Sequence, residues 1–218
     1  ADAQLAWAQE VREWTPTVIG SVFNNAGVAL ACSVRDADPD DDQWVWDINF
    51  HGVVNGTRAF LPILVEQNEG AIVNTSSIFG LAAVGMQSAY CAAKFAVRGY
   101  TEALRQEMLG SGVTAVTVHP GGVNTNIVRN GRYRVEHGEG GPTPEEMAAE
   151  FAAVTVTTAD KAAEIIHRGV EAGKSRIIVG TDARLLDLLS RVTPSHYFDV
   201  MTKLQAPINK ARRAASPS

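Results

Sequence analysis

Short apolar segments and longer helical patterns alternate along this chain. Residues 71–75 predict a strand, and a helical pattern at 89–108 begins after a glycine-containing loop. The same alternation recurs on both sides of this unit. Further strands are expected at 18–23, 114–118 and 176–179, and further helices at 1–14, 43–67, 145–153, 159–172 and 182–191. Strands that alternate with helices favour an α/β fold.

A tyrosine and a lysine lie one turn apart in the helical pattern 89–108. Residues four apart share a helix face, so the ammonium of Lys94 is expected near the phenol of Tyr90. A nearby positive charge lowers a tyrosine pKa from its usual value of about 10, which suits acid–base chemistry near neutral pH. Ser77 follows the strand 71–75 and is placed to offer a hydroxyl to the same substrate oxygen. The same spacing also occurs by chance on solvated helices, so the pair indicates an active site only when further motifs accompany it.

Four further motifs accompany the pair along the chain. They are Asn24–Gly27 (Asn-Asn-Ala-Gly), Asn49, Ser77 thirteen residues before Tyr90, and Pro120–Thr125 (Pro-Gly-Gly-Val-Asn-Thr). In this order and at these spacings, the chain resembles the short-chain dehydrogenase/reductase family from Val18 to about Thr125. The resemblance implies a doubly wound parallel sheet in a Rossmann-like three-layer sandwich. It also implies an NAD- or NADP-dependent oxidoreductase that interconverts a secondary alcohol and a ketone or aldehyde.

The resemblance also implies a role for each motif residue. Tyr90 would be the general acid in reduction and the general base in oxidation, and Ser77 would steady the substrate oxygen. Lys94 would lower the pKa of Tyr90 and hold the nicotinamide ribose, and Asn49 would hold a water that links Lys94 to solvent. The backbone of Val123 and the side chain of Thr125 would bind the nicotinamide carboxamide. The full set of expected cofactor contacts is Asn25, Ala26, Gly27, Tyr90, Lys94, Pro120, Gly121, Val123 and Thr125.

The pattern loosens at 126–158, where several glycines and prolines bracket the short helix expected at 145–153. This stretch corresponds to the family's variable substrate-covering segment. Five apolar residues are candidates for a substrate pocket: Phe79, Val84, Met86, Ile127 and Phe151. Such a pocket would favour an apolar alcohol or ketone over a sugar. An ordinary packing role for these side chains is an equally open alternative.

No glycine-rich dinucleotide loop of the form GxxxGxG or GxGxxG stands between a strand and a helix in this sequence. Cofactor phosphates need such a loop and the helix N-terminus behind it. Two βα units, roughly 60 residues in all, would be needed before Ala1 to supply it. We therefore expect residues 1–218 to be one domain that is incomplete at its N-terminus. The choice between NAD and NADP stays open, because the residue that reads the ribose 2′ position would lie in the same missing part.

Two other functions stay open from the sequence. If the chain is complete, it is instead a catalytically silent relative that serves as a binding or oligomerisation module. A sugar-nucleotide epimerase or dehydratase can share the tyrosine–lysine spacing, but Asn24–Gly27 speaks against it.

Composition and residue spacing exclude several classes of partner. A net charge of −5 argues against nucleic acid, which requires a concentrated basic face. Cys32, Cys91 and the five histidines show no metal-ligand spacing, so no metal is expected. No apolar run approaches the roughly 18 residues of a membrane span, which predicts a soluble cytoplasmic protein. The expected partners are a small-molecule substrate and further copies of the chain, as a homodimer or homotetramer through the helices at 43–67 and 89–108.

Overall fold

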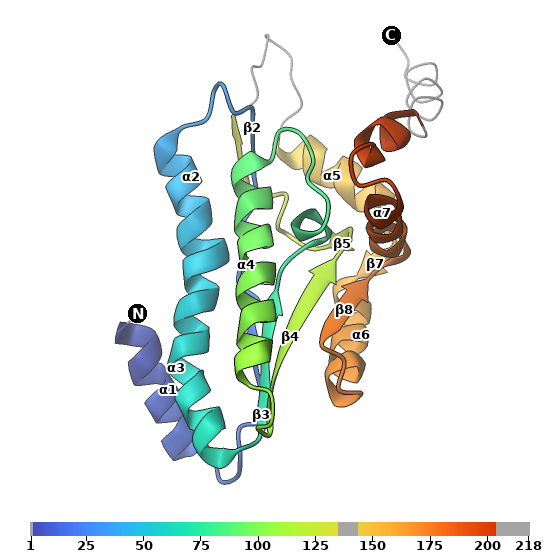
Figure 1. The fold of residues 1–218 in the computed structure, drawn as a ribbon. Helices are drawn as coiled ribbons and strands as arrows, with labels where there is room; N and C mark the ends of the chain where they lie inside the picture. Colours follow the sequence, from blue (N-terminus) through green and yellow to red (C-terminus); the bar gives the residue numbers. More distant parts are fainter. Residues whose placement is uncertain (1, 135–143, 204–218) are drawn as a thin grey trace.

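The computed structural model describes residues 2–134 and 144–203 (Figure 1). The strands are β1 (Ser21–Asn24), β2 (Leu30–Cys32), β3 (Gly70–Thr75), β4 (Val113–Pro120), β5 (Val123–Asn124), β6 (Arg132–Arg134), β7 (Thr157–Thr158) and β8 (Arg176–Val179). The α-helices are α1 (Asp2–Trp14), α2 (Pro39–Trp46), α3 (Gly52–Gln67), α4 (Ser88–Glu107), α5 (Pro144–Val154), α6 (Ala159–Glu171) and α7 (Thr181–Val192). A π-helical segment (Asp47–His51) joins α2 to α3, and a short 3-10 helix (Ile78–Gly80) precedes α4.

Four parallel strands form the main sheet in the order β1-β3-β4-β8. Helices α2 and α3 lie between β1 and β3 in the chain, α4 lies between β3 and β4, and α5 and α6 lie between β4 and β8. In the register, Ile72 pairs with Val22 on one side and with Ala115 on the other. Parallel neighbours require such long helical crossovers. The predicted α/β fold with a parallel sheet is therefore confirmed.

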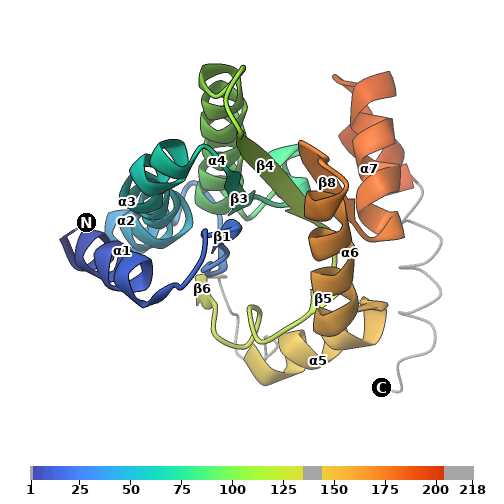
Figure 2. The ribbon, with the colours of Figure 1, turned by 90° about the horizontal axis from the view of Figure 1, so that it is seen from below.

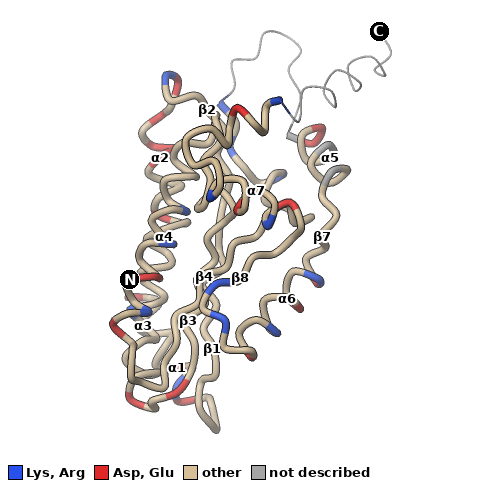
Figure 3. The backbone as a smooth tube through the Cα atoms, turned by 45° about the vertical axis from the view of Figure 1, so that its right-hand side comes forward, with Lys and Arg blue, Asp and Glu red and all other residues tan. Residues whose placement is uncertain are grey.

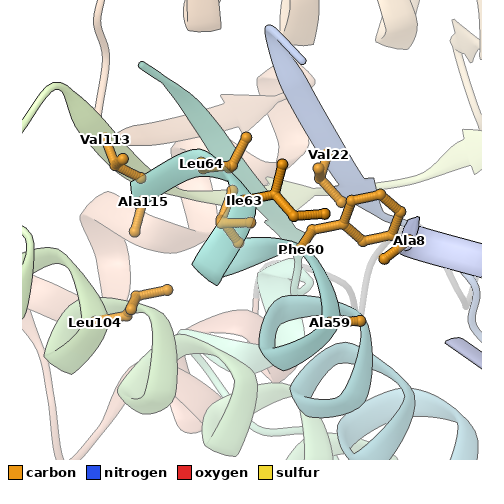
Figure 4. Packing of buried hydrophobic residues seen from close by; sticks show 10 residues of the cluster. Ala8, Val22, Ala59, Phe60, Ile63, Leu64, Leu104, Val113 and Ala115 are labelled. Atoms are coloured by element: carbon orange, nitrogen blue, oxygen red, sulfur yellow. The ribbon is translucent and has the colours of Figure 1, made fainter. Parts of the chain in front are cut away.

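Helices cover both faces of this sheet (Figure 2). On one face, Phe60 of α3 and Leu104 of α4 belong to one buried cluster (Figure 4). The same cluster includes Ile72 of β3. On the other face, Val73 packs in a second cluster with Ala162 of α6. Neighbouring residues of a strand point to opposite faces, and both faces of β3 are buried. This explains why β3 reads as a continuous apolar run in the sequence.

Helix α6 has an apolar side against the sheet and a charged side toward solvent. Its Ile165 and Ile166 pack against the sheet. Lys161, Glu164 and Arg168 form ion pairs of 2.7 Å on the outer side, where basic and acidic residues lie close together (Figure 3). Among the described helices, none combines the length and the apolarity that crossing a bilayer requires.

The helical run from α2 to α3 begins at Pro39, within the acidic stretch 38–42 that precedes the apolar helical pattern at 43–67. Asp38 caps it, because the carboxylate of Asp38 accepts a hydrogen bond of 3.0 Å from the backbone N–H of Asp40. Pro39 follows at the first helical position, where its missing N–H costs nothing. Asn49 lies in the π-helical segment Asp47–His51, which interrupts the α-helical run.

Two other expectations need correction. The strand predicted at 18–23 begins only at Ser21, because the side-chain amide of Gln67 holds both the N–H of Ile19, at 3.2 Å, and its carbonyl, at 2.7 Å. The described parts of 126–158 contain two short strands that were not predicted: β6, which pairs with β2, and β7, which pairs with β5. The helix predicted at 145–153 is present as α5, and residues 135–143 lie outside the described part of the chain.

Candidate active site

Three loops meet at the carboxyl ends of β1, β3 and β4. They begin with Asn25, Ser76 and Gly121, which follow directly on these three neighbouring strands. In open α/β sheets, ligands bind in the crevice outside this edge. Most motif residues that the sequence singled out stand in these loops or on helix α4.

Helix α4 and the loop after β3 bring Ser77, Tyr90 and Lys94 together. The Ser77 hydroxyl lies close enough to the Tyr90 phenol to favour its ionised form and so to lower its pKa. The same hydroxyl accepts a hydrogen bond of 3.1 Å from the N–H of Phe79, which caps the 3-10 helix and fixes the serine. The Lys94 Nζ lies 5.8 Å from the centre of the Tyr90 ring. All three motif side chains are at least nine-tenths buried, so the predicted cluster exists as a packed unit.

The protonation of this cluster is governed by burial. Removal from water raises the pKa of Tyr90, and the nearby Ser77 hydroxyl opposes this only in part. Burial also lowers the pKa of Lys94 to about 8. The lowering of the Tyr90 pKa by Lys94 stays a prediction, because burial is the largest influence on both side chains here. The ammonium of Lys94 instead donates a hydrogen bond of 3.0 Å to the carbonyl of Thr75.

The Asn-Asn-Ala-Gly turn approaches the same lysine. A Cβ added at Gly27 would lie 3.2 Å from the side-chain oxygen of Asn49 and 3.5 Å from the Lys94 Nζ. The Asn49 amide in the π-helical segment holds the backbone of Val28, accepting from its N–H and donating to its carbonyl, each at 2.9 Å. Gly27, Asn49 and Lys94 therefore meet at one point. Both polar atoms of the Asn49 side chain are occupied by Val28, and its role in a water relay stays a prediction.

A buried polar network below the turn was missed by the sequence analysis. The Asn24 amide donates to the side-chain oxygens of Asn74, at 2.8 Å, and Thr57, at 3.2 Å. The Asn74 amide donates in turn to the Thr101 hydroxyl at 3.0 Å. An asparagine within the apolar strand 71–75 was the available signal. This network joins β1 and β3 to α3 and α4 and holds the turn from beneath, while the Asn25 side chain accepts from the Thr75 hydroxyl at 3.1 Å.

The loop after β4 continues the sheet hydrogen bonds before it opens toward the site. The Gly121 N–H donates to the carbonyl of Val179 at 2.9 Å. Beyond it, Thr125 is exposed, and its hydroxyl accepts from the N–H of Ile127 at 3.4 Å. His119, just before the loop, is fully buried and hydrogen-bonds through Nδ1 to the carbonyl of Ser77 at 3.0 Å. The sequence analysis did not select His119, although it ties two motif loops together.

The five candidate pocket residues are only partly brought together. The Phe79 ring meets the Tyr90 ring edge to face, with centres 6.4 Å apart. Met86 is 44% exposed, has a positive φ of 65° and uses its carbonyl to accept from the N–H of Cys32. Val84, Ile127 and Phe151 are each partly buried. The apolar pocket remains a prediction beyond the contact of Phe79.

The residues present fit the nicotinamide half of a dinucleotide. The absence of a side chain at Gly27 lets the backbone lie close to the cationic Lys94, and the exposed Thr125 stands on a loop at the same sheet edge. Within residues 2–134 and 144–203, no three histidine, cysteine, aspartate or glutamate side chains gather as metal ligands would.

Known proteins resemble this chain in sequence and in fold. The family model for short chain dehydrogenase matches residues 2–135. A protein of Mycobacterium tuberculosis, named provisionally as oxidoreductase SadH, is 44% identical over 200 residues, which cover 90% of this chain and 70% of that relative.

Two solved structures give the same result at the level of the fold. A short chain dehydrogenase/reductase of Burkholderia phymatum, in complex with NAD, is 28% identical with a TM-score of 0.74, over 87% of this chain and 71% of that one. The closed form of a serine dehydrogenase complexed with NADP⁺ is 26% identical with a TM-score of 0.68, over 80% and 71% of the two chains. With a family model that matches most of its length and a relative this similar, the chain belongs to the short-chain dehydrogenase/reductase family of oxidoreductases.

Proposed function

We propose that this protein transfers a hydride between a nicotinamide cofactor and a carbon that bears a hydroxyl or carbonyl group. The observation that carries the proposal is the buried cluster of Ser77, Tyr90 and Lys94, in which the Lys94 Nζ lies 5.8 Å from the centre of the Tyr90 ring. A phenol that exchanges a proton, a hydroxyl that holds the same oxygen and a nearby cation are the groups this reaction needs from a protein. The oxidoreductase name of the mycobacterial relative supports the same reaction class.

The bound cofactor supplies or accepts the hydride, and the residues of the chain manage the proton and the substrate oxygen. In reduction, Tyr90 donates its phenolic proton to the carbonyl oxygen; in oxidation, it removes the hydroxyl proton. Ser77 donates a hydrogen bond to the same oxygen and stabilises its developing negative charge. Burial of the phenol favours its protonated form, which is the form that reduction needs. Oxidation needs the ionised phenolate, which burial disfavours and the Ser77 hydroxyl favours.

Lys94 and the two flanking loops hold the cofactor in this proposal. The Lys94 ammonium would bind the ribose hydroxyls, and its neighbour Asn49 would hold a water that connects Lys94 to solvent. Asn25, Ala26, Gly27, Pro120 and Gly121 would contact the nicotinamide half. The Val123 backbone and the Thr125 side chain would bind its carboxamide.

Either NAD or NADP fits the proposal, since one structural relative is described with NAD and another with NADP⁺. Fluorescence titration with NADH and NADPH decides between them. A chain that binds neither would favour the alternative of a catalytically silent module.

The proposed substrate is an apolar secondary alcohol or its ketone, because the Phe79 ring flanks the Tyr90 phenol. A panel of alcohols and ketones, followed by nicotinamide absorbance, tests this; activity confined to sugars or polyols would remove the apolar pocket. We further propose a homodimer or homotetramer through the helical run at 43–67 and α4. Light scattering on the purified protein tests this.

Tyr90→Phe tests the reaction directly. The substitution removes only the phenolic oxygen, so turnover should fall by about 10²- to 10⁴-fold while NADH affinity stays within about twofold. Tyr100→Phe is the matched control on the same helix, because Tyr100 lies ten residues after Tyr90 in the chain. This variant should retain the turnover of the wild type. Near-wild-type turnover of Tyr90→Phe would refute the assignment.

A further inference from the structure

A carboxylate from helix α7 sits against the loop that follows β4. Asp182 stands in the first turn of α7, and its Oδ2 accepts a hydrogen bond of 2.7 Å from the N–H of Gly122. A negative charge is favoured at this end of a helix. The contact joins two segments 60 residues apart in the chain.

Two glycines leave room for this carboxylate. A Cβ added at Gly121 would lie 2.2 Å from Oδ2 of Asp182, and one added at Gly180 would lie 2.3 Å from Oδ1. Gly180 has a φ of 101°, a conformation that itself favours glycine. Gly121 has no such positive φ, so its backbone does not require glycine. The Asp182 side chain therefore accounts for glycine at position 121.

The same carboxylate binds the loop at the point where it leaves the sheet. Gly121 makes the last sheet-like hydrogen bond, from its N–H to the carbonyl of Val179. Gly122 is the next residue, and Val123 begins β5, which pairs with Thr157. Asp182 supplies the acceptor for the one loop residue between these two paired segments.

We infer that Asp182 is a positioning residue that fixes the loop carrying Val123 and Thr125. The inference rests on the proposed function in one respect: this loop is the one proposed to hold the nicotinamide carboxamide. Asp182 contacts Gly122 and acts on the cofactor only through the loop.

Amide hydrogen exchange of the cofactor-free protein tests the structural half of the inference. In Asp182→Ala, the Gly122 N–H loses its acceptor, and its exchange should accelerate by about tenfold. Asp182→Asn keeps a side-chain oxygen in place and should restore most of the protection. Asp160→Asn, which changes an exposed aspartate in the first turn of α6, is the control and should leave Gly122 unchanged. Equal exchange of Gly122 in wild type and Asp182→Ala would overturn the inference.

A pair of substitutions tests the glycine cradle. Gly121→Ala drives its new methyl group into the carboxylate, so it should disturb the loop in the wild-type background and much less in the Asp182→Ala background. The readouts are Gly122 exchange and the NADH dissociation constant. An equal effect of Gly121→Ala in both backgrounds contradicts the cradle.

Cofactor titration separates this inference from the proposed function. Asp182→Ala should raise the NADH dissociation constant by about fivefold and leave the protonation chemistry of Tyr90, seen in the pH profile of turnover, unchanged. If the wild type binds neither nicotinamide cofactor, the proposed function fails, and the exchange measurement alone still decides the role of Asp182. If the wild type binds NADH and Asp182→Ala binds it equally well, the link from the loop to the cofactor is overturned.

Discussion

His119 is a buried base that the fold keeps uncharged. Burial lowers its pKa to about 4, the hydrogen bond to the Ser77 carbonyl opposes this, and the charges of Arg176 and Arg98 favour the neutral ring further. Its Nδ1 therefore donates to Ser77, while its Nε2 has no partner in the described structure. The neutral imidazole fixes the backbone of the serine whose hydroxyl meets Tyr90.

This gives a pH dependence of stability with a definite sign. Between pH 6.5 and 4, the unfolded chain binds a proton at His119 that the folded chain refuses, so the free energy of unfolding falls as the pH falls, by roughly 3 kcal/mol in all. His119→Asn keeps an N–H donor for Ser77 without a titrating ring. Urea unfolding at pH 7 and pH 4.5 should show a smaller loss for this variant than for wild type. Equal losses would count against the prediction.

At the residue scale, the sequence pointed correctly to the meeting of Ser77, Tyr90 and Lys94. Helical spacing places Tyr90 and Lys94 on one face, and the end of β3 places Ser77 opposite them. The pKa of Tyr90 was not predictable in this way, because it depends on burial and on where the flexible lysine points. His119 escaped notice because a lone histidine beside a proline has no distinctive spacing.

At the scale of elements, the approach of α3 to β1 depends on Gly56. A Cβ at this position would lie 2.1 Å from the side-chain oxygen of Asn24. Gly56→Ala should therefore lower the free energy of unfolding by about 1–3 kcal/mol and displace the turn above Asn24. Gly99→Ala is the matched helical control, since a Cβ there meets nothing within 4 Å and should be neutral or stabilising by up to about 1 kcal/mol. Thermal unfolding compares the two, and an equal response would exclude the steric cause.

A second contact between elements joins α2 to β6. The buried Asp41 accepts hydrogen bonds of 2.7 Å from both Arg132 and Arg134, and the Arg132 guanidinium also lies 4.0 Å from the Trp44 ring centre. The bond from Arg134 is the largest cause that lowers the pKa of Asp41. The resulting stability is present above the ordinary aspartate pKa and is lost as the pH falls through the lowered value.

Asp41→Asn should release this contact while it preserves the size of the side chain. Limited proteolysis at neutral pH should then cleave the β6 region several-fold faster than in wild type, because one carboxylate holds both arginines. Asp40→Asn, at the exposed neighbouring position, provides the control. Unchanged cleavage in Asp41→Asn would show that the pairing of β2 with β6 alone holds this segment.

The sequence was less informative about such small elements. Strands β2 and β6 have three residues each, and their partners stand about 100 positions apart in the chain. Neither strand shows a period of alternation long enough to detect. The long helices and the buried strands β3 and β4 were found because their apolar patterns extend over many residues.

At the scale of the whole molecule, the parallel sheet with helices on both faces follows from the order of strands and helices. Because consecutive parallel strands need a helical crossover, the alternation allows few other arrangements. The alternation does not predict the contact between α7 and the loop after β4. This contact depends on one carboxylate and two glycines.

The π-helical turn at Asn49 lets one helical run meet two requirements: Asn49 must face Val28, and Phe60 must face the sheet. Each residue added to or removed from a helix rotates everything beyond it by about 100°. A single deletion within Asp47–His51 would leave a smoother helix, yet it would turn either Asn49 away from Val28 or Phe60 away from the sheet. Length in this stretch is therefore constrained more strictly than residue identity, and homologues should tolerate substitutions there far more readily than insertions or deletions.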